Sequence, residues 1–363
     1  MPAAAPDING FVATLAGRGS SEAKAAAVAA LEGLAGEEAH RTKIFLADGA
    51  VKQLVLLAAN GPADLGVRAA TALGRLGATQ ATRAAIVAAG AVPPLVALLG
   101  SPDEDIREHA VVALAAIACE DPPRRAIAAA GAAPLASAML TGSPDRTAAL
   151  ALLAALALAE ENAGAIVAAG VLPQLVDLLA SADEGRAAVA MDALAALGRE
   201  QHAQQLHGLG ATPRLQMLMS GPNERSRVAA TEALASMAQH PEVAQALLDS
   251  GDAGVLPAVV SMLKEGQTEG KVAAARLLMN FTGHDTLPAL REAVVTAGAL
   301  VPLITLVASG SPKGKANSTV AVMHLALDRR LRGSIDAAVK VAASQGLPGG
   351  VAGVKATIQR LCY

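Results

Sequence analysis

Apolar and polar residues follow one another along this chain in blocks rather than one by one. In residues 90–121 a short apolar run, PPLVALL, is followed by a polar loop and then by a longer apolar run. Within the longer run, the apolar positions 106, 110, 113, 114 and 117 fall on one face of a helix. The pattern therefore predicts a short helix, a loop and a longer amphipathic helix.

The same block returns about every forty residues. Each copy has a Gly before its short apolar run, and these glycines lie 39 to 44 positions apart. They are Gly49, Gly90, Gly131, Gly170, Gly210, Gly254 and Gly298. A Pro follows three residues later in five copies and four residues later, as Pro302, in a sixth. A period of this size is typical of helical repeat arrays.

Each junction carries residues that suit a change from one helix to the next. Gly ends a short helix, because it adopts a left-handed conformation at little cost, and Pro opens the following helix, where its missing N–H is not needed. Ser101–Glu104 and Ser181–Glu184 predict capping boxes at the start of the longer helix. A further short helix, PPRRAIAAAG in one copy, leads to the next Gly. We therefore expect three helices per unit.

Composition supports an all-α protein without an internal linker. Hydrophobic residues make up 53% of the chain and aromatic residues only 1%, and small side chains allow helices to pack closely. No stretch rich in charge, Ser or Pro divides the sequence. We expect one domain over 1–363, with an irregular N-terminal cap at 1–48, repeats at 49–345 and a truncated C-terminal cap at 346–363.

Two uncharged stretches, 126–144 and 293–312, are long enough to be considered as membrane spans. Each contains a Gly and a Pro near its middle, so we interpret both as buried helix pairs and expect no membrane span. The N-terminus has no basic region followed by an apolar one, and two cysteines cannot form a disulfide framework. A cytoplasmic location is therefore expected.

No motif in the sequence indicates a chemical reaction. The seven histidines are scattered, and no HExxH, CxxC or GxSxG pattern occurs. Gly310–Ala316 is similar to a phosphate loop, but it has three residues between its glycines instead of four and Ala after the Lys, so we interpret it as a loop between helices. Cys119 is expected to be a small buried side chain. We expect no enzymatic activity, no metal and no cofactor.

Charge is distributed unevenly along the chain. Residues 264–363 hold 12 Lys and Arg against 6 Asp and Glu, whereas residues 1–263 hold 17 against 26. The basic C-terminal third is a candidate surface for an acidic partner, with a simple solvated surface as the alternative. The net charge of −3 and the four aromatic residues argue against nucleic-acid binding.

Three helices in about forty residues, with Gly and then Pro at the junction, resemble the armadillo repeat. The likeness covers residues 7–361, and the phrase GAVPPLVALL followed by AVVALAAIA is most similar to armadillo arrays of plant and algal proteins. This resemblance implies an all-α, right-handed superhelix, or α-solenoid, of about eight three-helix units. It also implies a non-enzymatic scaffold that binds proteins along a concave groove lined by the third helices.

In the armadillo import receptors the third helix carries a Trp and, four residues later, an Asn. This chain has no Trp, and only Asn280 matches the Asn, so recognition of a basic import signal is not expected. The groove residues that the resemblance implies are Arg75, Val112, Ala116, Leu153, Ala157, Asp192, Glu232, Arg276, Asn280 and His324. Such a groove would be apolar between 112 and 157, acidic at 192 and 232 and then polar to basic, which suits an amphipathic helix as ligand.

The resemblance leaves two kinds of assembly open. One is a structural subunit of a large complex such as a ciliary axoneme, with a cytoskeletal or ciliary location. The other is an adaptor for ubiquitin ligation or membrane docking. Because the repeats begin close to residue 7, an adaptor of this kind is expected to lack the U-box of the related ligases.

Overall fold

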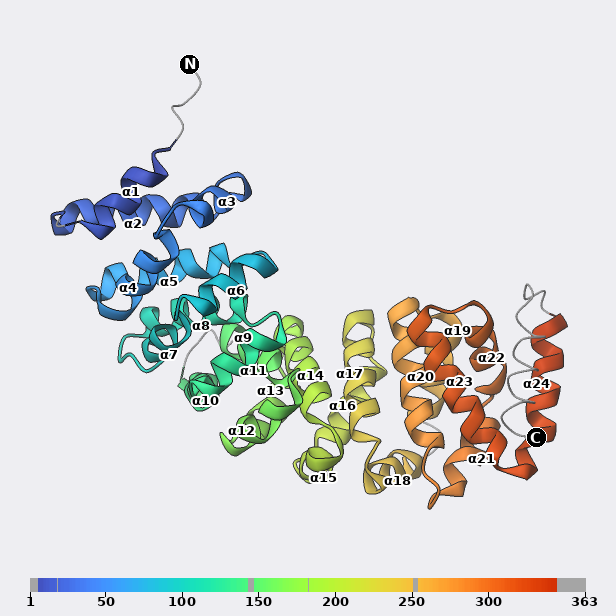
Figure 1. The fold of residues 1–363 in the computed structure, drawn as a ribbon. Coiled ribbons are helices and arrows are strands. Elements are labelled where there is room, and N and C mark those ends of the chain that lie inside the picture. Colours follow the sequence, from blue (N-terminus) through green and yellow to red (C-terminus); the bar gives the residue numbers. More distant parts are fainter. Residues whose placement is uncertain (1–5, 18, 143–146, 182, 251–253, 345–363) are drawn as a thin grey trace. The chain divides into compact units, whose positions relative to one another are not determined.

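The computed structural model describes residues 6–17, 19–142, 147–181, 183–250 and 254–344. Every regular element in these ranges is a helix (Figure 1), which confirms the predicted all-α class. Up to residue 174 the α-helices are α1 (Ile8–Ala16), α2 (Ser21–Ala35), α3 (Glu38–Leu46), α4 (Ala50–Asn60), α5 (Ala63–Leu76), α6 (Gln80–Ala88), α7 (Val92–Leu99), α8 (Glu104–Ile117), α9 (Asp121–Ala129), α10 (Ala132–Gly142), α11 (Thr147–Ala157) and α12 (Ala163–Ala168). A 3₁₀ helix, η1 (Glu160–Asn162), precedes α12.

The chain divides into two compact units, residues 1–174 and residues 175–363, with the division inside α13 (Val171–Leu178). The helices after α13 are α14 (Glu184–Leu197), α15 (Glu200–Gly208), α16 (Ala211–Met219), α17 (Glu224–Met237), α18 (Pro241–Asp249), α19 (Val255–Glu265), α20 (Thr268–Thr282), α21 (Pro288–Thr296), α22 (Leu300–Ser309), α23 (Pro312–Leu327), η2 (Arg329–Leu331) and α24 (Arg332–Ser344).

In the first unit, equivalent helices of successive repeats pack side by side (Figure 1). The second helices of the repeats, α1, α4, α7 and α10, form one row, and the third helices, α2, α5, α8 and α11, form another. The first helices α6 and α9 also pack together. Within the predicted irregular cap, residues 1–48, α1 and α2 already take the places of a second and a third helix.

The second unit is built in the same way. Its third helices are α14, α17, α20 and α23, its second helices α16, α19 and α22, and its first helices α15, α18 and α21. Packing between equivalent helices buries the apolar stripe that no single repeat could cover alone. The predicted C-terminal cap, 346–363, lies outside the described residues.

The glycines at the repeat junctions turn the chain from a first helix into a second helix. Six of the seven have φ between 77° and 85°, a left-handed conformation that strains other residues. Gly254 is the exception, because its φ is −81° and it directly precedes α19. The predicted role is therefore confirmed at six junctions and wrong at Gly254.

The predicted capping boxes are wrong by two residues. Asp103, and not Ser101, is the N-cap of α8, and its Oδ1 accepts a hydrogen bond from the backbone N–H of Asp105 at 3.0 Å. Asp183 takes the same place before α14 and accepts from the backbone N–H of Arg186 at 3.1 Å. In both turns the preceding Ser Oγ accepts from the Asp backbone N–H instead. A carboxylate at this position complements the positive end of the helix dipole.

Two smaller expectations also need correction. Ser311 is the N-cap of α23, so residues 312–316 form the first turn of that helix rather than a loop. Cys119 is exposed and not buried, because it follows α8 at the surface, where its Sγ lies 3.4 Å from the carbonyl oxygen of Ala116.

Within the described ranges, no single helix combines the length and the apolar character that a membrane span requires. Three pairs of successive helices would suffice by length and composition together, but the two helices of each pair are bent from one another by 83°, 117° and 84°. The last of these pairs, α21 and α22, contains most of the apolar stretch 293–312, which is therefore a helix pair as predicted.

Candidate binding groove of the third helices

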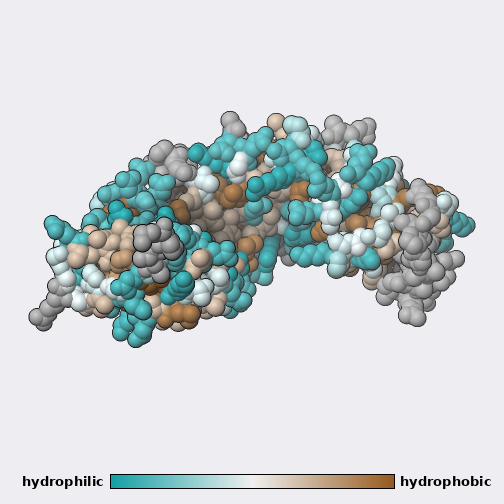
Figure 2. Space-filling model, turned by 90° about the horizontal axis from the view of Figure 1, so that it is seen from above, coloured by the Kyte–Doolittle hydropathy of each residue, from teal (hydrophilic) through white to brown (hydrophobic). Residues whose placement is uncertain are grey.

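The first unit has a cavity of about 520 Å³ between the third helices α5 and α8. Its lining contains three of the predicted groove residues, Arg75, Val112 and Ala116. Val112 is 52% exposed and is the large aliphatic side chain of this lining. Figure 2 shows one face of the molecule, on which hydrophobic residues form patches among hydrophilic ones. A cavity of this size with apolar side chains in its lining is typical of a binding site.

The alignment missed four other residues of this cavity, Gly74, Glu108, His109 and Ala113. Glu108 and His109 precede Val112 by one helical turn, so they lie on the same face of α8. The i, i+4 and i, i+3 spacing from Val112 is the sequence signal that could have identified them.

A second cavity, of about 560 Å³, adjoins the first and shares Thr71 and His109 with it. It lies toward the N-terminal ends of α5 and α8, and four carboxylates line it, those of Glu32, Asp64, Asp103 and Asp105. The face of these two helices is therefore acidic at one end and apolar at the other.

The positive charges of Arg68 and Arg75 do not neutralise this acidic end, because both guanidinium groups are paired with Glu32 of α2. The Arg68 guanidinium lies 3.0 Å from a Glu32 carboxylate oxygen. Arg75 donates to the backbone carbonyl of Glu32 at 2.7 Å and lies 3.6 Å from its carboxylate. The predicted groove residue Arg75 thus links α2 to α5.

Leu153 and Ala157 do not line a groove. They are 1% and 0% exposed in the core of the first unit. The burial pattern of α11 repeats that of α8 at a spacing of 39 residues, so Ala151 and Ala155 correspond to Val112 and Ala116. The predicted apolar patch of Val112, Ala116, Leu153 and Ala157 is therefore wrong. Of these four residues, Val112 is the large side chain that is exposed.

In the second unit, Asp192, Glu232 and Arg276 lie at corresponding positions on the third helices α14, α17 and α20. Arg276 donates to the Glu232 carboxylate at 2.5 Å and to the Ser236 hydroxyl at 3.0 Å. Burial raises the pKa of the Asp192 carboxyl; Arg225 opposes this rise and the negative charge of Glu232 adds to it. Asp192 nevertheless remains exposed, so its carboxylate is available on this face.

Asn280 and His324 join neighbouring third helices. The Asn280 amide donates to the backbone carbonyl of Ala235 at 2.5 Å, which links α20 to α17. The Nδ1 atom of His324 lies 3.3 Å from the carbonyl oxygen of Met279 and 3.4 Å from the Thr282 hydroxyl, which links α23 to α20. In the second unit, the predicted groove side chains Arg276, Asn280 and His324 therefore all contact the preceding third helix.

Comparison with known proteins identifies the repeat. Residues 79–118, which contain α6, α7 and α8, match the family model "Armadillo/beta-catenin-like repeat". No curated protein matches the chain.

Solved structures resemble the chain over greater lengths. An engineered protein from the Northeast Structural Genomics Consortium is 27% identical with a TM-score of 0.83, over 98% of this chain and 88% of that one. The designed armadillo repeat protein YIII(Dq)4CqI is 27% identical with a TM-score of 0.60, over 64% and 100%. The designed armadillo repeat protein YIII(Dq.V1)4CPAF, in complex with the peptide (KR)4, is 25% identical with a TM-score of 0.56, over 64% and 99%.

Proposed function

We propose that the chain, which contains an armadillo repeat and is similar to designed armadillo repeat proteins, is a non-enzymatic scaffold that binds a segment of a partner protein along its third helices. The observation that carries this proposal is the cavity of about 520 Å³ with Val112 exposed at its edge. The peptide bound to one of the similar designed proteins supports a peptide ligand.

The proposed ligand is an amphipathic helix. Its apolar side chains would contact Val112 and Ala116, and a basic side chain one or two turns away would reach Asp64 and Asp105 in the adjoining acidic cavity. Helices commonly bind in grooves through such regularly spaced apolar anchors.

A peptide-display selection against the immobilised protein tests this proposal. Peptides selected on the wild type are measured again on Val112→Asp and on Met217→Asp. Met217 is a matched control, because it is 76% exposed but lies on the second helix α16. Affinity should fall at least about tenfold for Val112→Asp, since a carboxylate replaces an apolar contact, and stay unchanged for Met217→Asp. Peptides that bind both variants like the wild type would contradict the proposal.

For the cellular role we propose a structural subunit of a large cytoplasmic assembly, such as a ciliary axoneme. An adaptor for ubiquitin ligation or membrane docking is the alternative. Both proposals rest on the resemblance of the sequence to plant and algal armadillo arrays. A permanent subunit should stay with its complex during sedimentation in high salt, whereas an adaptor bound through exposed charges should dissociate.

A further inference from the structure

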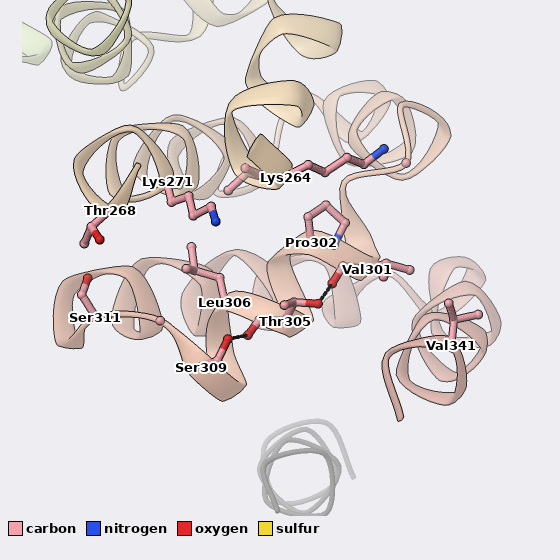
Figure 3. A pocket seen from close by; sticks show the side chains of 13 residues that line it. Lys264, Thr268, Lys271, Val301, Pro302, Thr305, Leu306, Ser309, Ser311 and Val341 are labelled. Carbon is pink, nitrogen blue, oxygen red and sulfur yellow. Dashed lines mark hydrogen bonds between the residues drawn. The ribbon is translucent and has the colours of Figure 1, made fainter. Parts of the chain in front are cut away.

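The second unit contains the same kind of cavity in two consecutive repeats. The Glu224 pocket, about 600 Å³, is formed by α16, α17 and α19. The Lys264 pocket, about 650 Å³, is formed mainly by α19, α20 and α22 (Figure 3). Ten lining positions of one pocket correspond to ten of the other at a spacing of 44 residues. The two pockets therefore share a backbone frame and differ in their side chains.

Two of the three charged side chains of the Glu224 pocket, Glu224 and Arg227, are hydrogen-bonded to neighbouring groups. The Glu224 carboxylate accepts hydrogen bonds from the backbone N–H and the side-chain amide of Gln267, at 3.3 and 3.1 Å. Arg227 donates to the backbone carbonyls of Gly221 and Pro222 at 3.3 and 3.1 Å. Glu224 and Arg227 therefore already have hydrogen-bond partners within the protein.

The Lys264 pocket carries the opposite charge. The corresponding residues are Ser220 and Lys264, Glu224 and Thr268, Arg227 and Lys271, and Glu265 and Ser309. Both acidic positions have become hydroxyl side chains, and one neutral position has become a lysine. Among the lining residues, the formal charge changes from −1 in the Glu224 pocket to +2 in the Lys264 pocket.

Neither Lys264 nor Lys271 makes an ion pair or a hydrogen bond with another described residue. In Figure 3 they extend from α19 and α20 on one side of the pocket, and Val301, Pro302 and Leu306 of α22 line the other. The Thr305 and Ser309 hydroxyls donate to backbone carbonyls of α22 at 2.9 Å each. The pocket thus presents two ammonium groups beside an aliphatic surface.

We propose that the Lys264 pocket binds an acidic segment of a partner protein. Carboxylates of the segment pair with Lys264 and Lys271, and an aliphatic side chain between them packs on Val301, Pro302 and Leu306. The volume is in the range of ligand sites, roughly 300–1,000 Å³. No aromatic side chain lines the pocket for the stacking that single-stranded nucleic acid requires.

This site is separate from the groove of the third helices, because none of the predicted groove residues lines it. The proposal also assigns the acidic partner expected for the basic residues 264–363 to one pocket of that segment. Of the basic side chains in that third, Arg330 is paired with Asp328 at 2.8 Å and Arg332 donates to the backbone carbonyl of Ala326 at 3.1 Å. The two lysines of the pocket have no such partner in the described part of the chain. Lys313 and Lys315 have none there either, but they lie outside this pocket, whereas Lys264 and Lys271 both line it.

Fluorescence polarisation with a short labelled peptide of alternating aspartate and leucine tests the proposal on the full chain. Lys264→Gln with Lys271→Gln should weaken binding roughly tenfold, because two charge pairs are lost. Thr268→Glu keeps both lysines but restores the carboxylate of the Glu224 pocket, and it should weaken binding to a similar extent. Asparagine–leucine and aspartate–serine peptides should bind more weakly than the aspartate–leucine peptide.

Two controls separate a specific site from general attraction. Lys313→Gln with Lys315→Gln removes the same charge from the exposed first turn of α23, outside the pocket lining, and should leave affinity nearly unchanged. Val112→Asp should also leave the affinity for the acidic peptide unchanged, because Val112 does not line this pocket. The two proposals can therefore fail independently of one another. No binding to the wild type, or an equal loss in the α23 control, would overturn the proposal. Circular dichroism confirms that each variant is folded.

Discussion

Gly74 of α5 lies against the backbone of Ala113 of α8, so closely that a Cβ atom on Gly74 would come within 2.8 Å of the Ala113 Cα atom. No side chain fits at that distance without separating the two helices. Since α5 and α8 line the 520 Å³ cavity together, this glycine sets the distance across the proposed binding surface.

Gly74→Ala is therefore expected to destabilise the first unit. Alanine is the better helix former by about 1 kcal/mol, but overpacking against a backbone typically costs about 1–3 kcal/mol, so a net loss results. The control is Gly33→Ala in α2, where nothing lies within 4 Å of the added methyl group, and stability should rise by about 0.5–1 kcal/mol. Urea unfolding followed by circular dichroism measures both, and equal effects would disprove this role of Gly74.

The same substitution at three leucine or valine positions should separate core from surface. Leu153→Asp places a carboxylate at a position that is 1% exposed and should cost at least about 3 kcal/mol. Leu158→Asp and Val112→Asp, at 55% and 52% exposure, should each change stability by less than about 1 kcal/mol. Thermal unfolding of the three variants gives the order, and a stable Leu153→Asp variant would show that the burial of α11 is wrong.

Asp192 should make a small pH-dependent contribution to stability. Burial raises the pKa of the Asp192 carboxyl in the folded protein, so the ionised form is disfavoured there. The free energy of unfolding therefore falls as the pH rises through the titration of this carboxyl. Asp192→Asn removes this loss and should stabilise the protein near pH 7 by no more than about 0.5 kcal/mol, since the side chain is exposed. The gain should vanish near pH 3, where the wild-type carboxyl is protonated in both states. Urea unfolding at the two pH values measures it; a gain that persists in acid contradicts the assignment.

A double-mutant cycle should detect the contact between Arg276 and Glu232. Both side chains are about 30% exposed and Arg276 also binds Ser236, so a coupling of about 1 kcal/mol is expected. The pair of Arg125 and Glu161 is the control, because its members are 61% and 48% exposed, and its coupling should be close to zero. Similar values for the two pairs would argue against a structural role for Arg276.

The repeat, its three helices and most junctions were predictable from sequence because they depend on local chemistry. Apolar spacing defines a helix face, and Gly supplies a left-handed corner that few other residues can adopt. Gly254 shows the limit of this argument, because the chain enters α19 there in an extended conformation. Gly254 occupies the same position in its repeat as the other six glycines, but its backbone conformation differs from theirs.

The groove was less predictable, and α11 shows why. The repeat that begins at Gly131 is 39 residues long, two residues shorter than the repeat before it, and the two missing residues fall before α11. Counting positions from Gly131 therefore placed the exposed face of α11 two residues too late. Thr147 is followed by an uninterrupted apolar run, and no polar side chain marks which positions are exposed. Asn280 and Arg276 were placed correctly on third helices, but sequence could not show that their polar groups are bound by the preceding repeat.

The rows of equivalent helices also have a kinetic consequence. Their main packing contacts join segments about forty residues apart, so neither unit has to bring distant parts of the chain together before it gains stability. Folding can therefore start at more than one repeat and spread to its neighbours. Damage at one repeat, such as a charge at Leu153, should then slow the completion of its own unit and leave the nucleation of the other unit unaffected.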